Sequence, residues 1–140
     1  MHDIALPDGR STIDLAAPPD DVDSVHDHLE SVWDRHPGVG ELDRISFETA
    51  LIELSANVIR HGDAGGGVTC SLTVVVSPDR IEAHLTDSGQ AGDIHLTPSL
   101  PDELAESGRG IPLITALVDV VRYERQGDAN RWYLARRRSR

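Results

Sequence analysis

The pattern of apolar positions is most informative between Glu41 and Gly62, where it predicts one helix that stops at the glycine. At about 100° per residue, the apolar side chains of this helix fall on two opposite arcs. One arc holds Ile45, Ile52, Ala56 and Ile59, and the other holds Phe47, Leu51, Leu54 and Val58. A surface helix has a single apolar stripe, so two arcs predict burial on both sides.

A polar strip runs between the two arcs and brings together a carboxylate and an amide. The strip consists of Ser46, Glu53, Asn57 and Arg60. Glu53 and Asn57 are four residues apart, so their side chains lie one above the other on the helix. Because burying such groups is costly without partners, the pair is either a satisfied polar contact that fixes helix packing or part of a functional site.

Two elements are predicted before this helix. Alternation at Thr12–Ala16 predicts a short edge strand, after a flexible lead-in of residues 1–10. A second helix begins at the prolines and aspartates of residues 18–21 and ends at Pro37 and Gly38. Its apolar stripe consists of Val22, Val25, Leu29, Val32 and Trp33.

Regular patterns return after Gly62. Alternation predicts strands at Val68–Val76 and Arg80–Asp87, which a turn joins into an antiparallel hairpin. Residues 88–107 hold several glycines and prolines and little periodicity, which is typical of a functional lid or a disordered segment. A glycine-opened helix is predicted at 108–118, followed by strands at 119–125 and 130–136.

The predicted helices are too few to cover both faces of a sheet built from these strands. We therefore expect an α+β two-layer sandwich, with one mixed, mainly antiparallel sheet and the helices on one face. Residues 11–136 are expected to form this single domain, and residues 137–140 a basic tail. Arginines crowd the C-terminal end, and the simplest expectation is a solvated, loose end; contact with an acidic protein is the alternative.

Composition excludes several functions. The chain of 140 residues carries a formal net charge of −11, which argues against direct nucleic-acid binding. Every basic residue is arginine, which excludes a lysine-dependent phosphate loop or a Schiff base. Cys70 is the only cysteine, so no internal disulfide can form. The apolar runs are too short for a membrane span and the N-terminus lacks a signal peptide, so we expect a cytoplasmic protein without membrane contacts.

Three separate features carry groups suited to nucleotide chemistry. They are Glu53 with Asn57 on the central helix, Asp87 followed by Gly89 at a strand end, and the glycine-rich helix start at 107–110. A glycine-rich helix N-terminus suits phosphate, and a side-chain amide oxygen can ligate Mg²⁺. A buried carboxylate can accept a hydrogen bond from an exocyclic amine, and a second carboxylate can act as a general base.

In this order, the three features resemble the motifs of the GHKL ATPase superfamily, which includes gyrase, Hsp90, histidine kinases and MutL. The resemblance is closest to its small serine/threonine-kinase anti-sigma factors of the RsbW and SpoIIAB type. Residues 53–62 resemble the family's N box, 87–89 its first glycine box and 107–114 its second. The resemblance extends from about Thr12 to Arg136 and implies the Bergerat (GHKL) ATPase fold.

The resemblance implies that the chain binds ATP and Mg²⁺. Asn57 would hold Mg²⁺ at the ATP phosphates, and Asp87 would accept a hydrogen bond from the adenine amino group. Gly89 would let the backbone approach the base, while Gly108 and Gly110 would line the phosphates.

The resemblance also implies phosphotransfer. Glu53 would take the proton from a serine or threonine hydroxyl of a partner protein. Arg60, His61 and Arg109 are candidates for phosphate or partner contacts, with surface salt bridges as the alternative for each.

The partners implied in this way are a STAS-type anti-anti-sigma protein, which the kinase would phosphorylate, and an alternative sigma factor, which it would bind. Homodimerisation is compatible with the family. The sequence departs from the usual first glycine box at Ala91, and residues 127–130 lack the Gly-Thr that often precedes the last strand. A non-catalytic ATP-binding or partner-sequestering module of the same fold is therefore the alternative. A third possibility is an ATPase or kinase acting outside sigma control.

Overall fold

The computed structural model describes residues 2–5, 9–17, 19–62, 67–89 and 110–139. The strands are β1 (His2–Ala5), β2 (Arg10–Ala17), β3 (Val68–Val76), β4 (Arg80–Asp87), β5 (Val120–Gln126) and β6 (Ala129–Arg137). The helices are α1 (Val22–Arg35), α2 (Glu41–Gly62) and α4 (Gly110–Leu117). The bounds predicted for α2, β3 and β4 are confirmed.

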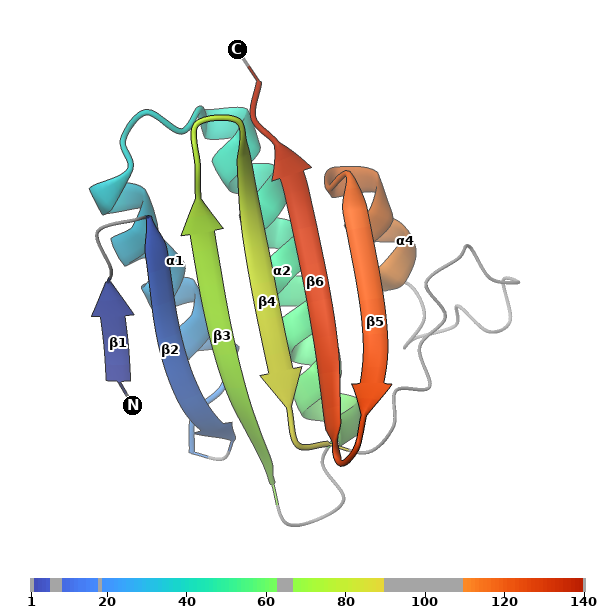
Figure 1. The fold of residues 1–140 in the computed structure, drawn as a ribbon. Coiled ribbons are helices and arrows are strands. Elements are labelled where there is room, and N and C mark those ends of the chain that lie inside the picture. Colours follow the sequence, from blue (N-terminus) through green and yellow to red (C-terminus); the bar gives the residue numbers. More distant parts are fainter. Residues whose placement is uncertain (1, 6–8, 18, 63–66, 90–109, 140) are drawn as a thin grey trace.

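The strands form one six-stranded sheet in the order β1-β2-β3-β4-β6-β5, and the helices of the described part lie on one face of it (Figure 1). This confirms the α+β two-layer architecture. Neighbouring strands are antiparallel throughout the described sheet, which corrects the expectation of a mixed sheet. The reason is topological. α1 and α2 together return the chain to the end where β2 stops, and β6 separates β4 from β5, which run in the same direction.

Both ends of the described chain are hydrogen-bonded to the domain, which corrects the expectation of loose ends. β1 pairs with β2 at the sheet edge, inside the segment expected to be a lead-in. At the other end, β6 runs to Arg137, and the next backbone N–H, that of Arg138, donates to the Asp79 carbonyl at 2.8 Å. The Ser139 N–H donates to Asp43 Oδ2 at 2.8 Å. The basic C-terminal end is therefore held by specific acceptors.

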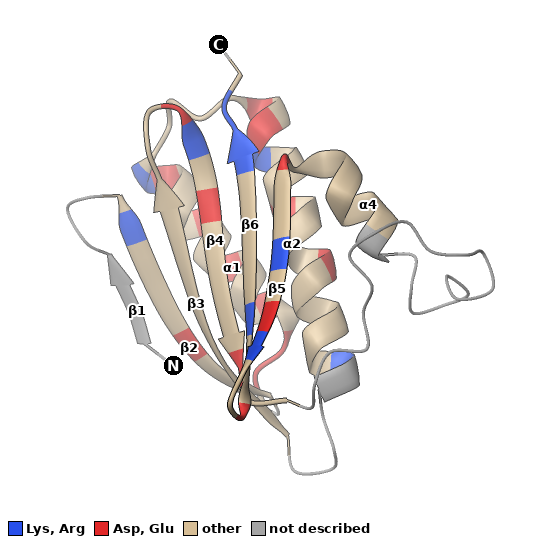
Figure 2. Ribbon diagram, turned by 45° about the vertical axis from the view of Figure 1, so that its right-hand side comes forward, with Lys and Arg blue, Asp and Glu red and all other residues tan. Residues whose placement is uncertain are grey.

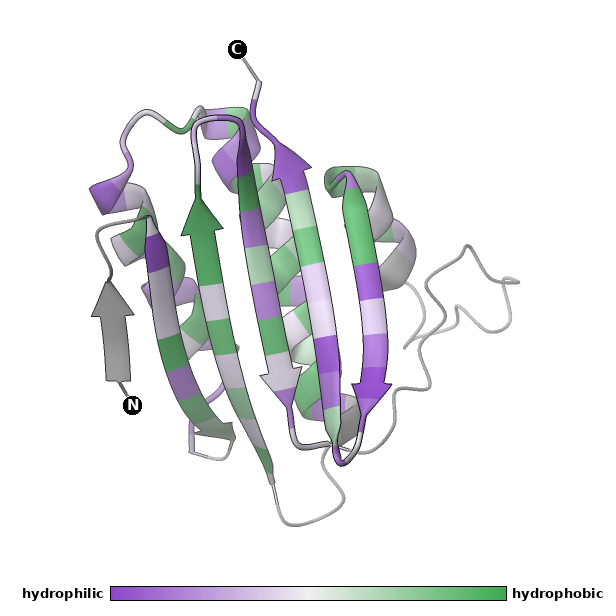
Figure 3. Cartoon of the chain, viewed as in Figure 1, coloured by the Kyte–Doolittle hydropathy of each residue, from purple (hydrophilic) through white to green (hydrophobic). Residues whose placement is uncertain are grey.

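The hydrophobic core lies between the sheet and the helices. Figure 3 shows residues of higher and lower hydropathy alternating along β3 and β4, in keeping with the alternating burial of these strands. The arc of α2 that carries Phe47, Leu51 and Leu54 is fully buried in this core. On the opposite arc, Ile52 is partly buried and Ile45 is 56% exposed. The prediction that α2 is buried on both sides is therefore confirmed for one arc and only in part for the other. The reason is that the eight-residue helix α4 packs along only part of α2.

Charge is distributed unevenly between the layers. Acidic residues are spread over α1 and α2, whereas β6 carries arginines and no carboxylate (Figure 2). In an acidic protein, this basic strand lies between the edge strand β5 and the central strand β4. Among the described helices, none is long and apolar enough to span a membrane.

Candidate functional site

Asp87 is a buried carboxylate at the end of β4, and only 2% of it is exposed. Its Oδ1 accepts hydrogen bonds from the Gly89 backbone N–H at 2.8 Å and from Asn130 Nδ2 at 2.9 Å. Its Oδ2 accepts one from Trp132 Nε1 at 2.9 Å. A carboxylate offers about four acceptor positions. Neutral donors fill three of them, and among the described residues none donates to the fourth, which lies on Oδ2.

The pairing of β4 with β6 brings these groups together. Asp87 lies opposite Asn130 in the antiparallel register, and Trp132 is two residues further along the same face of β6. The Asn130 Oδ1 accepts from the Tyr123 hydroxyl at 2.6 Å and from Arg125 Nη1 at 3.2 Å. Because these two donors occupy the amide oxygen, the amide NH₂ of Asn130 is directed to Asp87.

The turn after Asp87 is anchored from both sides. Arg125 Nη1 donates to the Gly89 carbonyl at 2.8 Å, which ties the turn to β5. Ser88 exchanges two hydrogen bonds with Thr69 of β3, each at 3.0 Å. The described part of the predicted first glycine box is therefore rigidly placed, while Ala91 lies outside the described residues.

Cys70 of β3 lies directly opposite Asp87 in the antiparallel pairing of β3 with β4. Burial, together with the negative charge of Asp87, raises the pKa of the Cys70 thiol to about 12. The thiol therefore stays protonated at neutral pH and acts as a small core group, because only a thiolate is a strong nucleophile or metal ligand.

Asn57 is the second buried polar group of the site, and it is 1% exposed. Its Oδ1 accepts a hydrogen bond from the Arg60 guanidinium one turn later on α2. Its Nδ2 has no partner among the residues that the structure describes. An unsatisfied buried donor costs about 1–3 kcal/mol, so this amide is better suited to a site that receives a ligand than to a purely structural contact.

Glu53 lies one turn before Asn57 and is partly exposed. It lines a hollow of about 320 Å³ between α1 and α2, together with His26 and Glu48. The carboxylate is therefore accessible from the surface of the helix layer. The two side chains therefore differ in exposure, because Asn57 is enclosed and Glu53 can be reached from outside.

The remaining predicted residues are less completely described. Gly89 is buried, Arg60 is exposed, and His61 belongs to the last turn of α2. Gly110 begins α4, as expected for a glycine at a helix start. Gly108 and Arg109 lie outside the described residues, so their expected phosphate contacts remain predictions.

Asn130 and Trp132 were not predicted as site residues. Alternation along the strand predicted at 130–136 indicates that Trp132 faces the core, and residues 127–130 stand out only because they lack the Gly-Thr pair. The signal that could have identified Asn130 is its polarity at an inward-facing position two residues before a buried tryptophan.

The described residues contain no group of three or more His, Cys, Asp or Glu side chains that could hold a metal ion. Mg²⁺ that binds together with a nucleotide does not require such a group. The donor set fits Mg²⁺ in that setting, because Mg²⁺ often takes one or two protein oxygens and completes its shell with phosphates and water. Asn57 Oδ1, which accepts a hydrogen bond from Arg60, is the oxygen for which this role is predicted.

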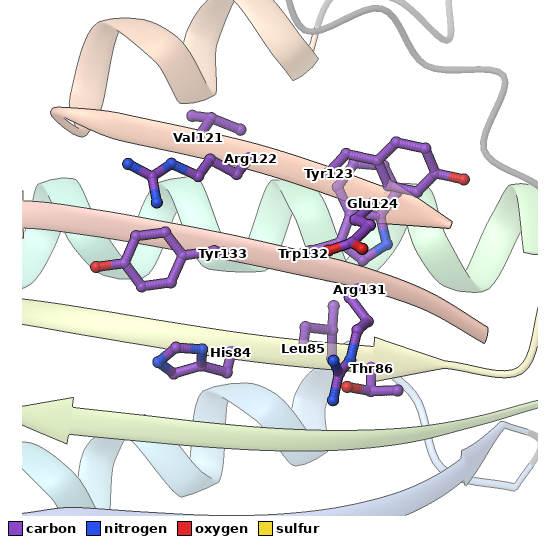
Figure 4. A pocket seen from close by; sticks show the side chains of 10 residues that line it. All are labelled: His84, Leu85, Thr86, Val121, Arg122, Tyr123, Glu124, Arg131, Trp132 and Tyr133. Atoms are coloured by element: carbon purple, nitrogen blue, oxygen red, sulfur yellow. The ribbon is translucent and has the colours of Figure 1, made fainter. Parts of the chain in front are cut away.

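A separate hollow of about 800 Å³ lies over β4, β6 and β5, and its lining is shown in Figure 4. On the open face of the sheet, the rings of His84 and Tyr133 are 4.9 Å apart, and Arg122 Cζ lies 5.6 Å from the Tyr133 centroid. Burial and a hydrogen bond to Glu82 raise the pKa of Tyr133. None of the predicted site residues lines this hollow.

Comparison with known proteins identifies the family. The chain matches the model of the histidine kinase-like ATPase domain over residues 15–134, and it therefore belongs to that family. The fold and this match thus define a histidine kinase-like ATPase domain of the GHKL type. No match is found among curated proteins.

Solved structures agree on the fold. The chain is similar to the RsbU and RsbW domains of Rv1364c from Mycobacterium tuberculosis, with a TM-score of 0.60 and 18% identity. That match covers 92% of this chain and 33% of the other. The chain is also similar to the Acinetobacter baumannii histidine kinase AdeS, with a TM-score of 0.50 and 18% identity over 91% of this chain and 68% of the other. At such identities the likeness concerns the fold alone.

Proposed function

We propose that this chain is an ATP-dependent protein serine/threonine kinase that also acts as an anti-sigma factor. The observation that carries the proposal is the buried Asp87 carboxylate, which three neutral donors hold so that it can accept one more hydrogen bond. This arrangement suits the amino group of adenine. The buried amide of Asn57 on α2 is the group suited to the phosphate end, where Mg²⁺ would neutralise the phosphates.

Glu53 is proposed as the general base. It would remove the proton of a serine or threonine hydroxyl while that oxygen bonds to the γ-phosphorus and the bridging oxygen leaves with ADP. Its partial exposure supports this role, because a protein substrate must reach it from the surface. Arg60 would leave the oxygen of Asn57 when the metal takes that position, and its guanidinium would then be available to the phosphates.

The partners are proposed from two observations. The motifs resemble those of anti-sigma kinases, and the first of the two similar structures carries a domain named RsbW. We therefore propose a STAS-type anti-anti-sigma protein as the phosphorylated substrate and an alternative sigma factor as the sequestered partner. Each is a proposal about binding, and a copurification from native cells followed by identification of the bound proteins addresses it.

The kinase proposal is tested with Glu53→Gln and the matched control Glu48→Gln. Both carboxylates are on α2 and line the same hollow. With Mg²⁺-ATP and the STAS-type protein encoded in the same genome, Glu53→Gln is expected to slow phosphotransfer by about 10²–10⁴-fold, while ATP affinity is retained. Glu48→Gln should behave as the unmodified chain does. Native transfer rates in Glu53→Gln would show that this residue is not the base.

A second candidate is a non-catalytic module that binds ATP and sequesters a partner. The contact of Arg60 with the Asn57 oxygen favours it, because a guanidinium there competes with the metal. Under this alternative, the unmodified chain binds ATP in calorimetry and binds the sigma factor, yet transfers no phosphate to any STAS-type protein. Observed transfer excludes it.

A further inference from the structure

Asn130 and Trp132 of β6 supply the two side-chain donors that hold Asp87. We propose that these residues set the base preference of the nucleotide site, by filling the acceptor positions of Asp87 until a single one is left. The inference rests on the proposed nucleotide site and names the residues that would make it selective. Both act through Asp87, so they are positioning residues.

The remaining position on the Asp87 carboxylate can accept a hydrogen bond but cannot donate one. Oδ1 already accepts from Gly89 and Asn130, and Oδ2 accepts from Trp132. A 6-aminopurine can donate one N–H to the remaining position. A 6-oxopurine would instead present an oxygen lone pair to a carboxylate, and the buried acceptor would stay unpaired. Sites of this kind reject a mismatched ligand strongly, because the unpaired buried group keeps its full desolvation cost.

Trp132 is buried and packs against a neighbouring aromatic ring, which fixes the direction of its indole N–H. The residue is 3% exposed, and its ring lies 4.3 Å from that of Tyr123, centroid to centroid. Figure 4 shows the two rings side by side. Tyr123 lies opposite Trp132 in the register of β5 and β6. The indole therefore packs against a side chain of the neighbouring strand, and its N–H donates to Oδ2 of Asp87.

Two side chains of β5 orient the amide group of Asn130. The Tyr123 hydroxyl and Arg125 both donate to its amide oxygen, so the amide nitrogen must face Asp87. Arg125 also donates to the carbonyl of Gly89. One hydrogen-bond network thus contains the carboxylate of Asp87, the amide of Asn130 and the turn at Gly89, and each of its donors has a defined direction. Fully satisfied networks of this kind are rigid.

A purely structural role for Trp132 makes a different prediction, and Trp33 provides the matched control. The chain has two tryptophans, and Trp33 also donates its indole N–H to a carboxylate, Glu48 Oε1, at 3.0 Å. Trp33 is on α1, and it too is buried. Replacing either by phenylalanine removes one indole–carboxylate hydrogen bond, but only Trp132→Phe removes one from Asp87.

The first test measures the affinities of ATP and inosine triphosphate by calorimetry, with Mg²⁺ present. The unmodified chain and Trp33→Phe should share the same preference for ATP. Trp132→Phe should lose about tenfold of that preference, as expected for one hydrogen bond to a charged group. An unchanged ratio in Trp132→Phe overturns the inference. If the unmodified chain binds neither nucleotide, the proposed function itself fails.

The deciding measurement of the second test uses Trp33→Phe and does not depend on the folding of Trp132→Phe. In Trp33→Phe, the tryptophan emission comes from Trp132 alone, and saturating ATP should change it because a new donor reaches the carboxylate that the indole contacts. In Trp132→Phe, where Trp33 alone emits, ATP should leave the emission unchanged. The inference is contradicted if ATP binds to Trp33→Phe, as calorimetry reports, and the emission of Trp132 does not respond.

Discussion

Asp43 and Asp87 are both buried carboxylates that accept three hydrogen bonds, but their donors differ in charge. Asp43 accepts from the Arg136 guanidinium at 2.9 Å, and from the backbone N–H and hydroxyl of Ser139 at 2.8 and 3.2 Å. Asp87 accepts from a backbone amide, a side-chain amide and an indole. The chain therefore supplies a cation to Asp43, whereas the described residues place only neutral donors on Asp87.

The difference separates a structural carboxylate from one suited to recognition. Burial raises the pKa of Asp43, but the hydrogen bonds from Ser139 and Arg136 outweigh it, so the pKa lies below its usual value. Arg136 also donates to the Leu117 carbonyl at 2.6 Å, so this one cluster ties α2, α4 and β6 together. In the described part of the chain no cation contacts Asp87, and its remaining acceptor position can take a donor from outside the chain.

The largest expected effect is on stability. Asp43→Ala should lower the free energy of unfolding by about 3–5 kcal/mol, because it leaves the mostly buried Arg136 without its partner. Urea denaturation measures this change. Arg137→Ala, an exposed arginine on the same strand, is the control and should change stability by no more than about 0.5 kcal/mol. Similar losses in the two variants would remove the structural role assigned to Asp43.

A smaller effect, on binding, is expected at the other carboxylate. Asp87→Asn should weaken ATP binding by about 30- to 100-fold, since an amide nitrogen cannot accept a hydrogen bond at the open position. Calorimetry measures the affinity. The folded fraction of Asp43→Ala should bind ATP as the unmodified chain does. Unaltered affinity in Asp87→Asn would mean that the nucleotide base does not use this carboxylate.

The smallest effect is a pH dependence of the contribution that Asp43 makes to stability. Its folded-state pKa lies below the ordinary value of 3.8, so its contribution to stability is complete above that value and is lost as the pH falls through the folded-state pKa. The destabilisation caused by Asp43→Asn should therefore be equal at about pH 7 and pH 5 and shrink below about pH 4. Urea denaturation of both proteins at each pH measures this. A constant difference down to about pH 2 would contradict the assignment.

Local sequence patterns were sufficient to predict many of the helices and strands and part of the candidate site. Periodicity placed α2 and its polar pair, and the end of an alternating segment placed Asp87 beside Gly89. The partners of the two carboxylates could not be found in this way. Asn130 and Asp87 are 43 residues apart, and Arg136 and Asp43 are 93 apart. Such contacts depend on the order and register of the strands, which the pattern of one segment does not contain.

The register of β6 has a further consequence for changes in chain length. Asn130, Trp132 and Arg136 are separated by even numbers of residues, so they project from the same face of the strand. Deleting one residue within β6 would turn part or all of this set toward the open face. The two-residue connection at Gly127 and Asp128, where the glycine has a φ of 62° and open space around it, lies outside the strand. Homologues that differ in length here should differ at this turn.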